Sequence, residues 1–367
     1  MEKIKVLHVV HNFLRGGIES FLYYTVKQQL SNQGLDVAIL CCSSKNNVVN
    51  HRIESLGIKI FYIDVSPFEY RLRTLNKIVK ICNNYDIIHF QVFIPTVCIY
   101  VQMKSNSKII HTVHSAGYVL RNHSLLEIIK NQLFVLCLNK SAGIAHNSPF
   151  TKTFWEKRGL KERDTNVFIY NGVNFSSSKI SEEPYQSMPD LREHFIIGTT
   201  SRLIPWKRVN LLIEAYKNAL PNLPQNVLLL IVGEGEEINK LKSLYDNVLH
   251  KKIRFIGYKS NITDYQSIMD LCIFPSVEEP FGLVSIECLH LGKRVIVMND
   301  GGGLTDIIKG YNPHYVARNF EDLVYKIISC SKLKIDGKEK ERIEYSKQFS
   351  VEIEEKQYFN FYKKVIQ

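Results

Sequence analysis

The sequence predicts an α/β protein made of two doubly wound halves, each built on a parallel sheet. Short apolar runs alternate with amphipathic stretches along most of the chain. The apolar runs hold few polar positions, which is typical of strands covered on both faces of a parallel sheet. This alternation stops in a polar stretch at 176–190 and then starts again, which indicates a second half.

The first half alternates strands and helices as far as residue 169. We predict strands at 4–10, 37–41, 58–63, 87–90, 108–113, 141–145 and 167–169, and helices that include 20–30, 72–83 and 125–138. A further helix is expected at 150–157. Ser148 is a favourable residue before a helix, and Pro149 fits the first helical position.

The second half repeats the pattern and ends in helices alone. We predict strands at 195–199, 227–232, 253–256, 271–274 and 294–298, with helices that include 208–220, 238–249 and 280–291. Two charged amphipathic helices follow residue 338 without a strand. Each half is therefore of Rossmann type.

The composition is that of a globular protein with room for two domains. The chain has 367 residues, of which 45% are hydrophobic and 23% charged. No apolar run reaches the roughly 20 residues that span a bilayer, and the first strand breaks too early for a signal peptide. The eight cysteines show no Cys-x-x-Cys spacing. We therefore expect reduced, buried thiols in a cytoplasmic protein without a zinc site.

The formal net charge of +11 suits an anionic partner. Nucleic acid, a phosphorylated substrate and an anionic membrane face all fit this charge, and so does a lysine-rich solvated surface without a partner. Charge alone does not choose among them.

Ligands of doubly wound sheets bind outside the carboxyl ends of the strands, and the residues at those ends are unusual here. Glycines, cations and carboxylates recur after the predicted strands of both halves. They include Gly16, Gly17, His114, Arg202, Gly233, Gly235, Tyr258, Glu279 and the three glycines at 301–303.

The stretch from Glu279 to Glu287 carries the most specific pattern. Pro280 suits the first helical position, so the N–H groups of residues 281–284 would be unpaired donors that can bind an anion. Glu287 lies about 12 Å beyond Glu279 at about 1.5 Å per residue. Two carboxylates that flank an anion site fit a phosphate with hydroxyl-rich groups on both sides, as in a nucleotide-sugar.

Arg202 and Lys207 follow the first strand of the second half. Lys207 would open the next helix, where a cation is unfavourable unless an anion is present. The pair therefore indicates a diphosphate clamp, in which Arg202 can hold two oxygens. A solvated basic turn is the alternative.

Two features of the first half are open to both structural and functional readings. Gly16 and Gly17 lie between the first strand and its helix, where glycine lets the backbone approach a ligand, but an ordinary turn also uses them. The spacing G-x-G-x-x-G is absent, which counts against a nicotinamide dehydrogenase. His114 ends a buried strand and could serve as a hydrogen-bond donor, an acid or a base, or be structural.

Taken together, these residues resemble the family-four retaining glycosyltransferases of the GT-B fold, a group that includes capsular-polysaccharide transferases. The glutamate pair around Pro280, Phe281, Gly282 and Leu283 is the most specific match. Supporting matches occur in the family's order over nearly the whole chain: 15–19, His114, 147–148, 171–173, 201–203, Lys207, 233–235, and Gly302 and Gly303 before Asp306.

The resemblance implies an architecture and its boundaries. It implies two Rossmann-like doubly wound domains that face each other across a cleft. Residues 1–173 would form the acceptor-side domain, 174–345 the nucleotide-sugar domain, and 346–367 a helix that crosses back to the first domain. Residues 116–123, which should help to form the acceptor pocket, lack a clear family pattern.

It also implies residue roles. Arg202 and Lys207 would bind the donor diphosphate, together with the N–H groups of Gly282, Leu283 and Val284. Glu287 would bind the ribose, and Glu279 the donor sugar. Gly16 and Gly17 would lie near the phosphate, His114 near the sugar and the leaving group, and Tyr258 near the base. The remaining donor-binding residues would be Gly233 and Phe281.

The expected activity is transfer of a hexose-type sugar from a UDP- or GDP-linked donor to a glycan or lipid-linked acceptor. It would serve synthesis of a cell-surface polysaccharide such as capsule or O-antigen, without cofactor, metal or nucleic acid. The protein would be cytoplasmic, with peripheral attachment to the inner membrane face left open. The alternatives are another GT-B enzyme such as a sugar-nucleotide 2-epimerase, and a non-catalytic nucleotide-sugar or nucleic-acid binding protein.

Overall fold

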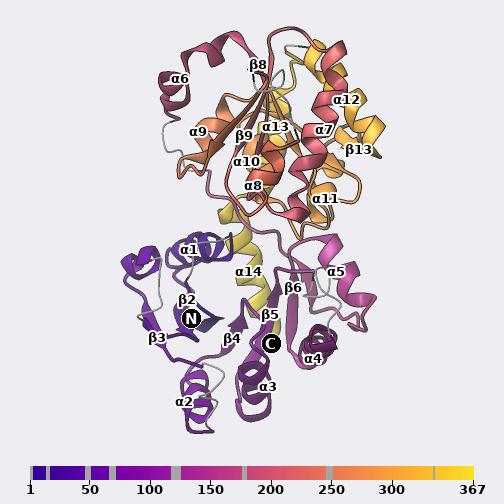
Figure 1. Ribbon diagram of the computed structural model, residues 1–367. Coiled ribbons are helices and arrows are strands. Elements are labelled where there is room, and N and C mark those ends of the chain that lie inside the picture. The colour runs from indigo at the N-terminus through magenta and orange to yellow at the C-terminus, as the bar shows by residue number, and fades with distance from the viewer. Residues whose placement is uncertain are drawn as a thin grey trace. The chain divides into compact units, whose positions relative to one another are not determined.

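A computed structural model describes residues 3–13, 17–45, 51–65, 72–116, 125–175, 180–244, 251–333 and 335–367. The chain divides into two compact units, which Figure 1 shows with their elements labelled. Unit 1 comprises Met1–Asn174 and Phe349–Gln367, and unit 2 comprises Phe175–Gln348. The sequence places these two boundaries at 173/174 and 345/346.

Unit 1 is built on a parallel sheet, as the apolar strand pattern predicts. The described strands are β1 (Ile4–Val10), β2 (Leu35–Cys41), β3 (Lys59–Tyr62), β4 (Ile87–Phe90), β5 (Lys108–Val113), β6 (Gly143–His146) and β7 (Asn166–Phe168). They lie in the order β3-β2-β1-β4-β5-β6-β7. The order reverses between β1 and β4, which makes the carboxyl ends of these two strands the switch point of the sheet.

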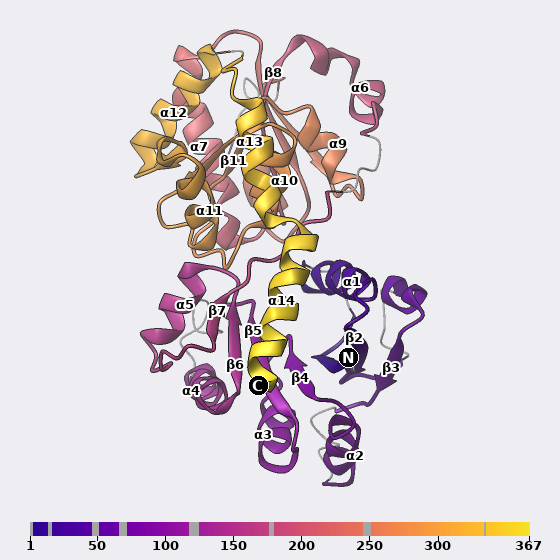
Figure 2. The same cartoon turned by 180° about the vertical axis from the view of Figure 1, so that it is seen from behind.

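Helices cover both faces of this sheet. The described helices of unit 1 are α1 (Gly17–Gln29), η2 (His51–Leu56), α2 (Leu72–Cys82), α3 (Pro95–Lys104), α4 (Leu125–Lys140), α5 (Pro149–Glu156) and α14 (Val351–Ile366). Apolar residues of α1 and α14 pack on one face, and those of α2 to α5 on the other. Figure 2 shows α14 running along the first of these faces beside α1. The Ser148 hydroxyl caps α5 with Pro149 in its first turn, which confirms the predicted N-terminus.

Backbone pairing explains why the last helix belongs to unit 1. The N–H of Val173 donates to the carbonyl of Phe349 (2.8 Å), and the N–H of Val351 donates to the carbonyl of Val173 (3.2 Å). The chain leaving unit 1 and the chain returning to it therefore form a short parallel bridge, which sets the start of α14.

Unit 2 repeats the parallel architecture. Its described strands are β8 (Phe195–Thr200), β9 (Val227–Val232), β10 (Ile253–Gly257), β11 (Leu271–Phe274), β12 (Arg294–Met298) and β13 (Val316–Ala317), in the order β10-β9-β8-β11-β12-β13. The order reverses between β8 and β11. Two Rossmann-like α/β domains with parallel sheets, as predicted, are thereby confirmed.

The described helices of unit 2 are mostly short. They are α6 (Glu183–Ser187), η3 (Pro189–Glu193), η4 (Pro205–Lys207), α7 (Val209–Ala219), η5 (Leu220–Asn222), α8 (Ile238–Lys242), α9 (Ile262–Ser267), α10 (Leu283–His290), α11 (Gly303–Tyr311), η7 (Pro313–Tyr315), α12 (Phe320–Lys332) and α13 (Glu339–Ser346), with η8 (Lys347–Phe349) at the boundary. The helix predicted at 238–249 is shorter in the structure, because α8 ends at Lys242 and residues 243–244 form a turn. Residues 245–250 lie outside the described residues.

The prediction of buried thiols is confirmed for seven of the eight cysteines. All eight cysteines are free, and seven of them are buried. In the part of the chain that the structure describes, no helix is both long and apolar enough to cross a bilayer.

Candidate active site

The carboxyl ends of β8 and β11 form the switch point of unit 2, and the loops after them carry the predicted donor residues. The loop after β8 contains Arg202 and Lys207, and the loop after β11 contains Glu279. Because neighbouring parallel strands end at the same edge of a sheet, these loops are brought together.

Backbone hydrogen bonds lock the loop after β11 against the loop after β12. The N–H of Glu278 donates to the carbonyl of Asp300 (2.8 Å), and the N–H of Glu279 donates to that of Gly301 (3.0 Å). In return, the N–H of Gly303 donates to the carbonyl of Glu279 (2.7 Å). Glu278 has a φ of +50°, which is unfavourable for a residue with a side chain. This pairing therefore holds Glu279 in a defined position at the strand ends.

Lys207 and Glu279 form an ion pair that the sequence did not predict. Nζ of Lys207 lies 2.5 Å from Oε2 of Glu279, and the two side chains are 13% and 22% exposed. Lys207 ends the turn η4 rather than opening a helix, because Arg208 is left-handed (φ +48°) and α7 begins at Val209. The expected position of Lys207 in a helix is therefore wrong. Its cation is balanced by a carboxylate instead.

Arg208 clamps three strand-end loops together. Its Nε donates to the carbonyl of Pro275 (2.7 Å), and its NH1 and NH2 groups bind the two carboxylate oxygens of Asp300 at 2.9 and 2.5 Å. A third bond runs from NH2 to the carbonyl of Ser276 (3.4 Å). The planar fork of a guanidinium can make all these bonds at once, whereas a lysine cannot.

Arg202 is the other predicted cation of this edge. Its side chain is exposed, and the guanidinium carbon lies 5.9 Å from the centre of the Trp206 ring. Among the described residues it makes no ion pair. An exposed guanidinium beside a paired lysine can accept an anion from solvent.

The first turn of α10 supplies backbone donors, but it starts later than predicted. The helix begins at Leu283, and Gly282 precedes it with φ +105°, a conformation that glycine tolerates best. Pro280 lies in the loop that bridges to Gly302, so the prediction of Pro280 at the first helical position is wrong. Within the described residues, the N–H groups of Leu283 and Val284 have no backbone acceptor. Phe281 is buried and anchors the turn.

Glu287 lies in the second turn of α10 in a largely desolvated position. Its Oε2 accepts a hydrogen bond from Nε2 of Gln266 (3.3 Å), which also donates to the hydroxyl of Thr200 (3.1 Å). Burial raises the pKa of Glu287 above its ordinary value, although the bond from Gln266 opposes this shift. This carboxylate therefore has unused acceptor capacity.

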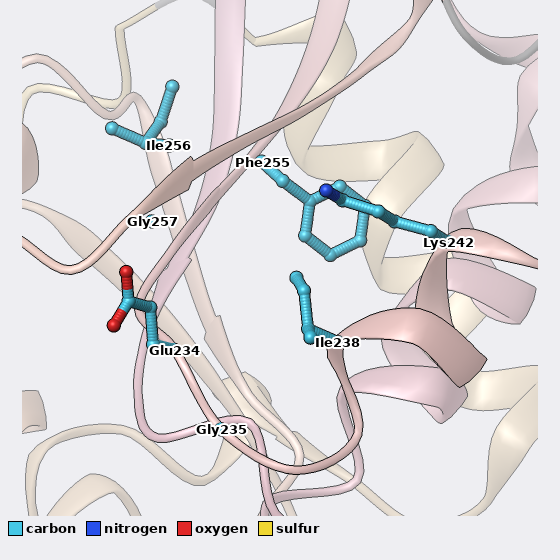
Figure 3. A pocket seen from close by; sticks show the side chains of 7 residues that line it. All are labelled: Glu234, Gly235, Ile238, Lys242, Phe255, Ile256 and Gly257. Atoms are coloured by element: carbon cyan, nitrogen blue, oxygen red, sulfur yellow. The ribbon is translucent and has the colours of Figure 1, made fainter.

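A pocket of about 450 Å³ lies beside the ends of β9 and β10 (Figure 3). Its lining combines apolar side chains, backbone and the Glu234 carboxylate: Glu234, Gly235, Ile238, Lys242, Phe255, Ile256 and Gly257. Position 233, next to this pocket, accommodates only glycine, because a Cβ atom added there would lie 1.9 Å from the carbonyl oxygen of Ser201. Tyr258 follows the pocket and is 60% exposed.

The remaining predicted site residues lie in unit 1. Gly17 is the first residue of α1, whereas Gly16 and residues 117–123 lie outside the described residues. The ring of His114 stands edge-on to Phe21 of α1, with centroids 4.7 Å apart. Its Nε2 lies 2.8 Å from Oε1 of Gln91. Burial lowers the pKa of His114 to about 3, so the imidazole is neutral at physiological pH.

Sequence reasoning missed three polar residues that shape these sites: Gln91, Arg208 and Gln266. Gln91 directly follows β4 and Arg208 follows η4, so the rule that placed the other strand-end residues could have found them. Gln266 lies in α9 and carries no such signal. Among the described residues, no group of three or more His, Cys, Asp or Glu side chains could hold a metal ion.

Two sequence families match the chain. Residues 15–177 match the family described as "Glycosyltransferase Family 4", and residues 187–349 match the one described as "Glycosyl transferases group 1". The two matches together take in most of both units.

Two named bacterial glycosyltransferases are similar to this chain over most of their length. The capsular polysaccharide biosynthesis glycosyltransferase CapH of Staphylococcus aureus is 24% identical, and the similar region covers 81% of each chain. The UDP-Gal:alpha-D-GlcNAc-diphosphoundecaprenol alpha-1,3-galactosyltransferase of Escherichia coli is 23% identical over 82% of this chain and 80% of that protein.

Solved structures share the fold. HepE of Anabaena in complex with UDP has a TM-score of 0.81 at 20% identity, covering 98% of this chain and 100% of that one. A glycosyltransferase from Rickettsia africae has a TM-score of 0.81 at 22% identity, covering 100% of both chains.

The clamp made by Arg208 leads to a stability prediction with an internal control. We expect Arg208→Lys to lower the free energy of unfolding by about 1 kcal/mol more than Arg254→Lys, because only Arg208 also binds two loop carbonyls. Arg254 makes a comparable bidentate pair with Asp190 elsewhere in unit 2. Urea unfolding of the two variants measures the difference, and equal losses would contradict a clamping role.

Proposed function

This chain is a glycosyltransferase of the group 1 family with the GT-B architecture, and from that premise we propose that it is a retaining, metal-independent hexosyltransferase that uses a nucleotide-sugar donor. One observation carries the proposal. Lys207, Glu279 and the N-terminus of α10 meet at the switch point of the unit 2 sheet. A cation, a carboxylate and free N–H groups together suit a diphosphate that bears a sugar.

The diphosphate would bind Arg202, Lys207 and the amides of Leu283 and Val284. Charge-assisted bonds from a guanidinium and an ammonium to phosphate are about twice as strong as neutral ones. The positive end of the α10 dipole adds to them, because it lies where the amides point. These groups would stabilise the charge that develops on the departing diphosphate, so that no metal ion is needed.

Lys207 and Glu279 would exchange partners when the donor binds. In the free protein Glu279 neutralises Lys207 at 2.5 Å. The incoming diphosphate offers Lys207 a more strongly charged partner, and Glu279 would then accept hydrogen bonds from hydroxyls of the transferred sugar. Glu279 would therefore neutralise Lys207 in the absence of the donor and bind the sugar in its presence.

The nucleoside would occupy the other side of the diphosphate. The partly apolar pocket beside β9 and β10 suits a base that stacks on side chains and bonds to backbone groups, and Gly233 and Tyr258 lie next to it in the chain. Glu287 would accept the ribose hydroxyls. Its carboxylate accepts one bond from Gln266 and can accept further bonds, which supports that role.

We propose front-face displacement as the reaction. The acceptor oxygen bonds to the anomeric carbon on the face from which the diphosphate departs, and its proton passes to the departing diphosphate oxygen. A carboxylate nucleophile is the usual means of retention in glycosidases. In the donor complex Glu279 would accept bonds from sugar hydroxyls and Glu287 from the ribose, so neither is favoured for that role. His114 would contact the donor sugar from unit 1.

The acceptor would be a lipid-linked glycan of a cell-surface polysaccharide. The named activities of the relatives from S. aureus and E. coli support this class. The net charge of +11 would favour an anionic inner membrane face. The family matches favour transfer over a sugar-nucleotide 2-epimerase or a non-catalytic binding protein.

Transfer assays with a panel of UDP- and GDP-sugars and diphosphoundecaprenol-linked acceptors test the proposal. We expect an α-linked product from an α-linked donor, by NMR of the new anomeric proton, in the presence of EDTA. Lys207→Met should lower kcat by about 100-fold, because one donor to the developing charge is lost.

A matched variant controls for charge and folding. Lys217→Met removes a lysine from α7 of the same unit and should leave transfer unchanged. A β-linked product, loss of activity in EDTA, or conversion of the donor without acceptor would each contradict the proposal.

The pKa of Glu287 gives a pH dependence whose sign follows from burial. Because burial raises this pKa above 4.5, the free carboxyl is protonated more readily than usual. Ribose hydroxyls donate to the ionised form and favour it. Affinity for UDP-glucose should therefore fall as pH falls through the raised pKa, beginning above pH 4.5. Calorimetric titrations between about pH 7.5 and pH 5 measure this fall.

A nucleotide-sugar is preferred to UDP for these titrations, because the phosphates of a nucleotide-sugar do not titrate in that range, whereas the terminal phosphate of UDP does. Glu287→Gln should bind more weakly, with little pH dependence over the same range. If the variant retained the full pH dependence of the wild type, Glu287 would not be the titrating group.

A further inference from the structure

Unit 1 buries a set of polar side chains on the sheet face covered by α1 and α14. His8 of β1 and His89 of β4 are fully buried, and Gln91 and Thr112 are nearly so. Burying a polar group without a hydrogen bond costs several kcal/mol. A polar set at the centre of an otherwise apolar face therefore has to be internally bonded.

The bonds of this set form a chain that starts at His114. Nε2 of His114 lies 2.8 Å from Oε1 of Gln91, and Nε2 of Gln91 lies 2.9 Å from Nδ1 of His8. Nε2 of His8 lies 2.9 Å from Oε1 of Gln29 in α1. Gln91 therefore links His114, the histidine predicted for the active site, to the buried ring of His8.

The chain continues to the last helix of the protein. Nε2 of Gln29 donates to the hydroxyl of Tyr362 (3.2 Å), which lies 3.0 Å from Nδ1 of His89. Nε2 of His89 lies 2.7 Å from the hydroxyl of Thr112, which lies 2.7 Å from that of Tyr358. The hydrogen-bonded chain that starts at His114 therefore includes two tyrosines of α14, Tyr362 and Tyr358, and ends at Tyr358.

From His114 to Tyr362 this chain runs in one sense. A neutral imidazole has one N–H and one acceptor nitrogen, and an amide accepts only at its oxygen and donates only from its nitrogen. His114 therefore donates to Gln91, Gln91 to His8, His8 to Gln29, and Gln29 to Tyr362. The hydroxyls of Tyr362, Thr112 and Tyr358 can donate or accept, so they leave the direction of the later bonds open. With the amides of Gln29 and Gln91 as placed, the hydrogen of His114 is on Nε2.

Burial keeps the histidines neutral, as this arrangement requires. It lowers the pKa of His8 to about 4 and that of His114 to about 3, and it holds that of His89 well below its ordinary value. Among the described residues, no protein group bonds to Nδ1 of His114. That nitrogen is left with a lone pair.

We propose that Gln91 is a positioning residue, which holds His114 in the tautomer that carries its hydrogen on Nε2 and leaves Nδ1 as an acceptor for a hydroxyl of the donor sugar. The last clause rests on the proposed function, whereas the tautomer itself does not. Phe21 fixes the ring plane by its edge contact, and Gln91 fixes which nitrogen carries the hydrogen. The bonds of Gln91 to His114 and His8 hold its amide between the two rings.

Nitrogen NMR of histidine-labelled protein tests the tautomer directly. Two-bond proton–nitrogen correlations distinguish the Nε2–H form from the Nδ1–H form, and His114→Asn identifies the signals of His114 among the 12 histidines. We expect a single Nε2–H tautomer in the wild type. An Nδ1–H tautomer, or signals averaged between the two, would overturn the proposal.

Two substitutions of Gln91 test its role. Gln91→Met removes the bonds to His114 and His8, and the longer contact with His89 at 3.3 Å, and should give averaged nitrogen signals for His114. It should also lower kcat/KM for the nucleotide-sugar about tenfold, as expected for one buried hydrogen bond, with the affinity for UDP unchanged. Gln91→Glu keeps an acceptor for Nε2–H and should restore both the single tautomer and kcat/KM. A His114 signal unchanged in Gln91→Met would overturn the role of Gln91.

His111→Phe is the matched control. His111 lies on β5 close to His114, but it stacks on Phe90 on the opposite face of the sheet and outside the relay. Its replacement should leave the His114 signals unchanged. If the wild type bound no nucleotide-sugar, the proposed function would fail. The NMR result would still decide the role of Gln91.

Discussion

The contact between Lys207 and Glu279 organises the active edge of unit 2. It joins the loop after β8 to the loop after β11 at the point where the strand order of the sheet reverses. Backbone pairing between residues 278–279 and 300–303 supports it, and so do the bonds of the Arg208 guanidinium to Pro275 and Asp300. We propose that this support holds the lysine beside the diphosphate position before the donor binds, which is the preorganisation that electrostatic catalysis requires.

The two units use buried polar groups in different ways. In unit 2 the carboxylates of Glu279 and Glu287 keep acceptor capacity that a substrate can use. In unit 1 the polar groups beneath α14 satisfy one another in a relay that ends at His114. Such a network contributes specificity of arrangement rather than net stability. It also explains why the last helix, which is distant in sequence, packs on the sheet with tyrosines instead of leucines.

Much of this fold could be predicted from the chain, because parallel strands covered on both faces have a plain apolar pattern. Six of the predicted strands, including 87–90 and 271–274, have the bounds found in the structure. Errors arose where loop contacts override local preference. Pro280 is a residue typical of a helix start, but it lies in the loop that pairs with Gly302. The helix α10 begins only after Gly282. Lys207 pairs with a carboxylate 72 positions away, and Gln91 acquires its role only when β1, β4 and α14 come together. No local pattern carries that information.

The central claim is that Glu279 holds Lys207 until the donor diphosphate replaces it. Calorimetric titration of Glu279→Gln with UDP and with the cognate UDP-sugar tests this most directly. Because the variant no longer neutralises Lys207, we predict that UDP binds roughly fivefold more tightly, equivalent to about 1 kcal/mol, while the extra affinity contributed by the sugar is lost. Weaker binding of UDP to the variant, with the preference for the UDP-sugar retained, would contradict the account.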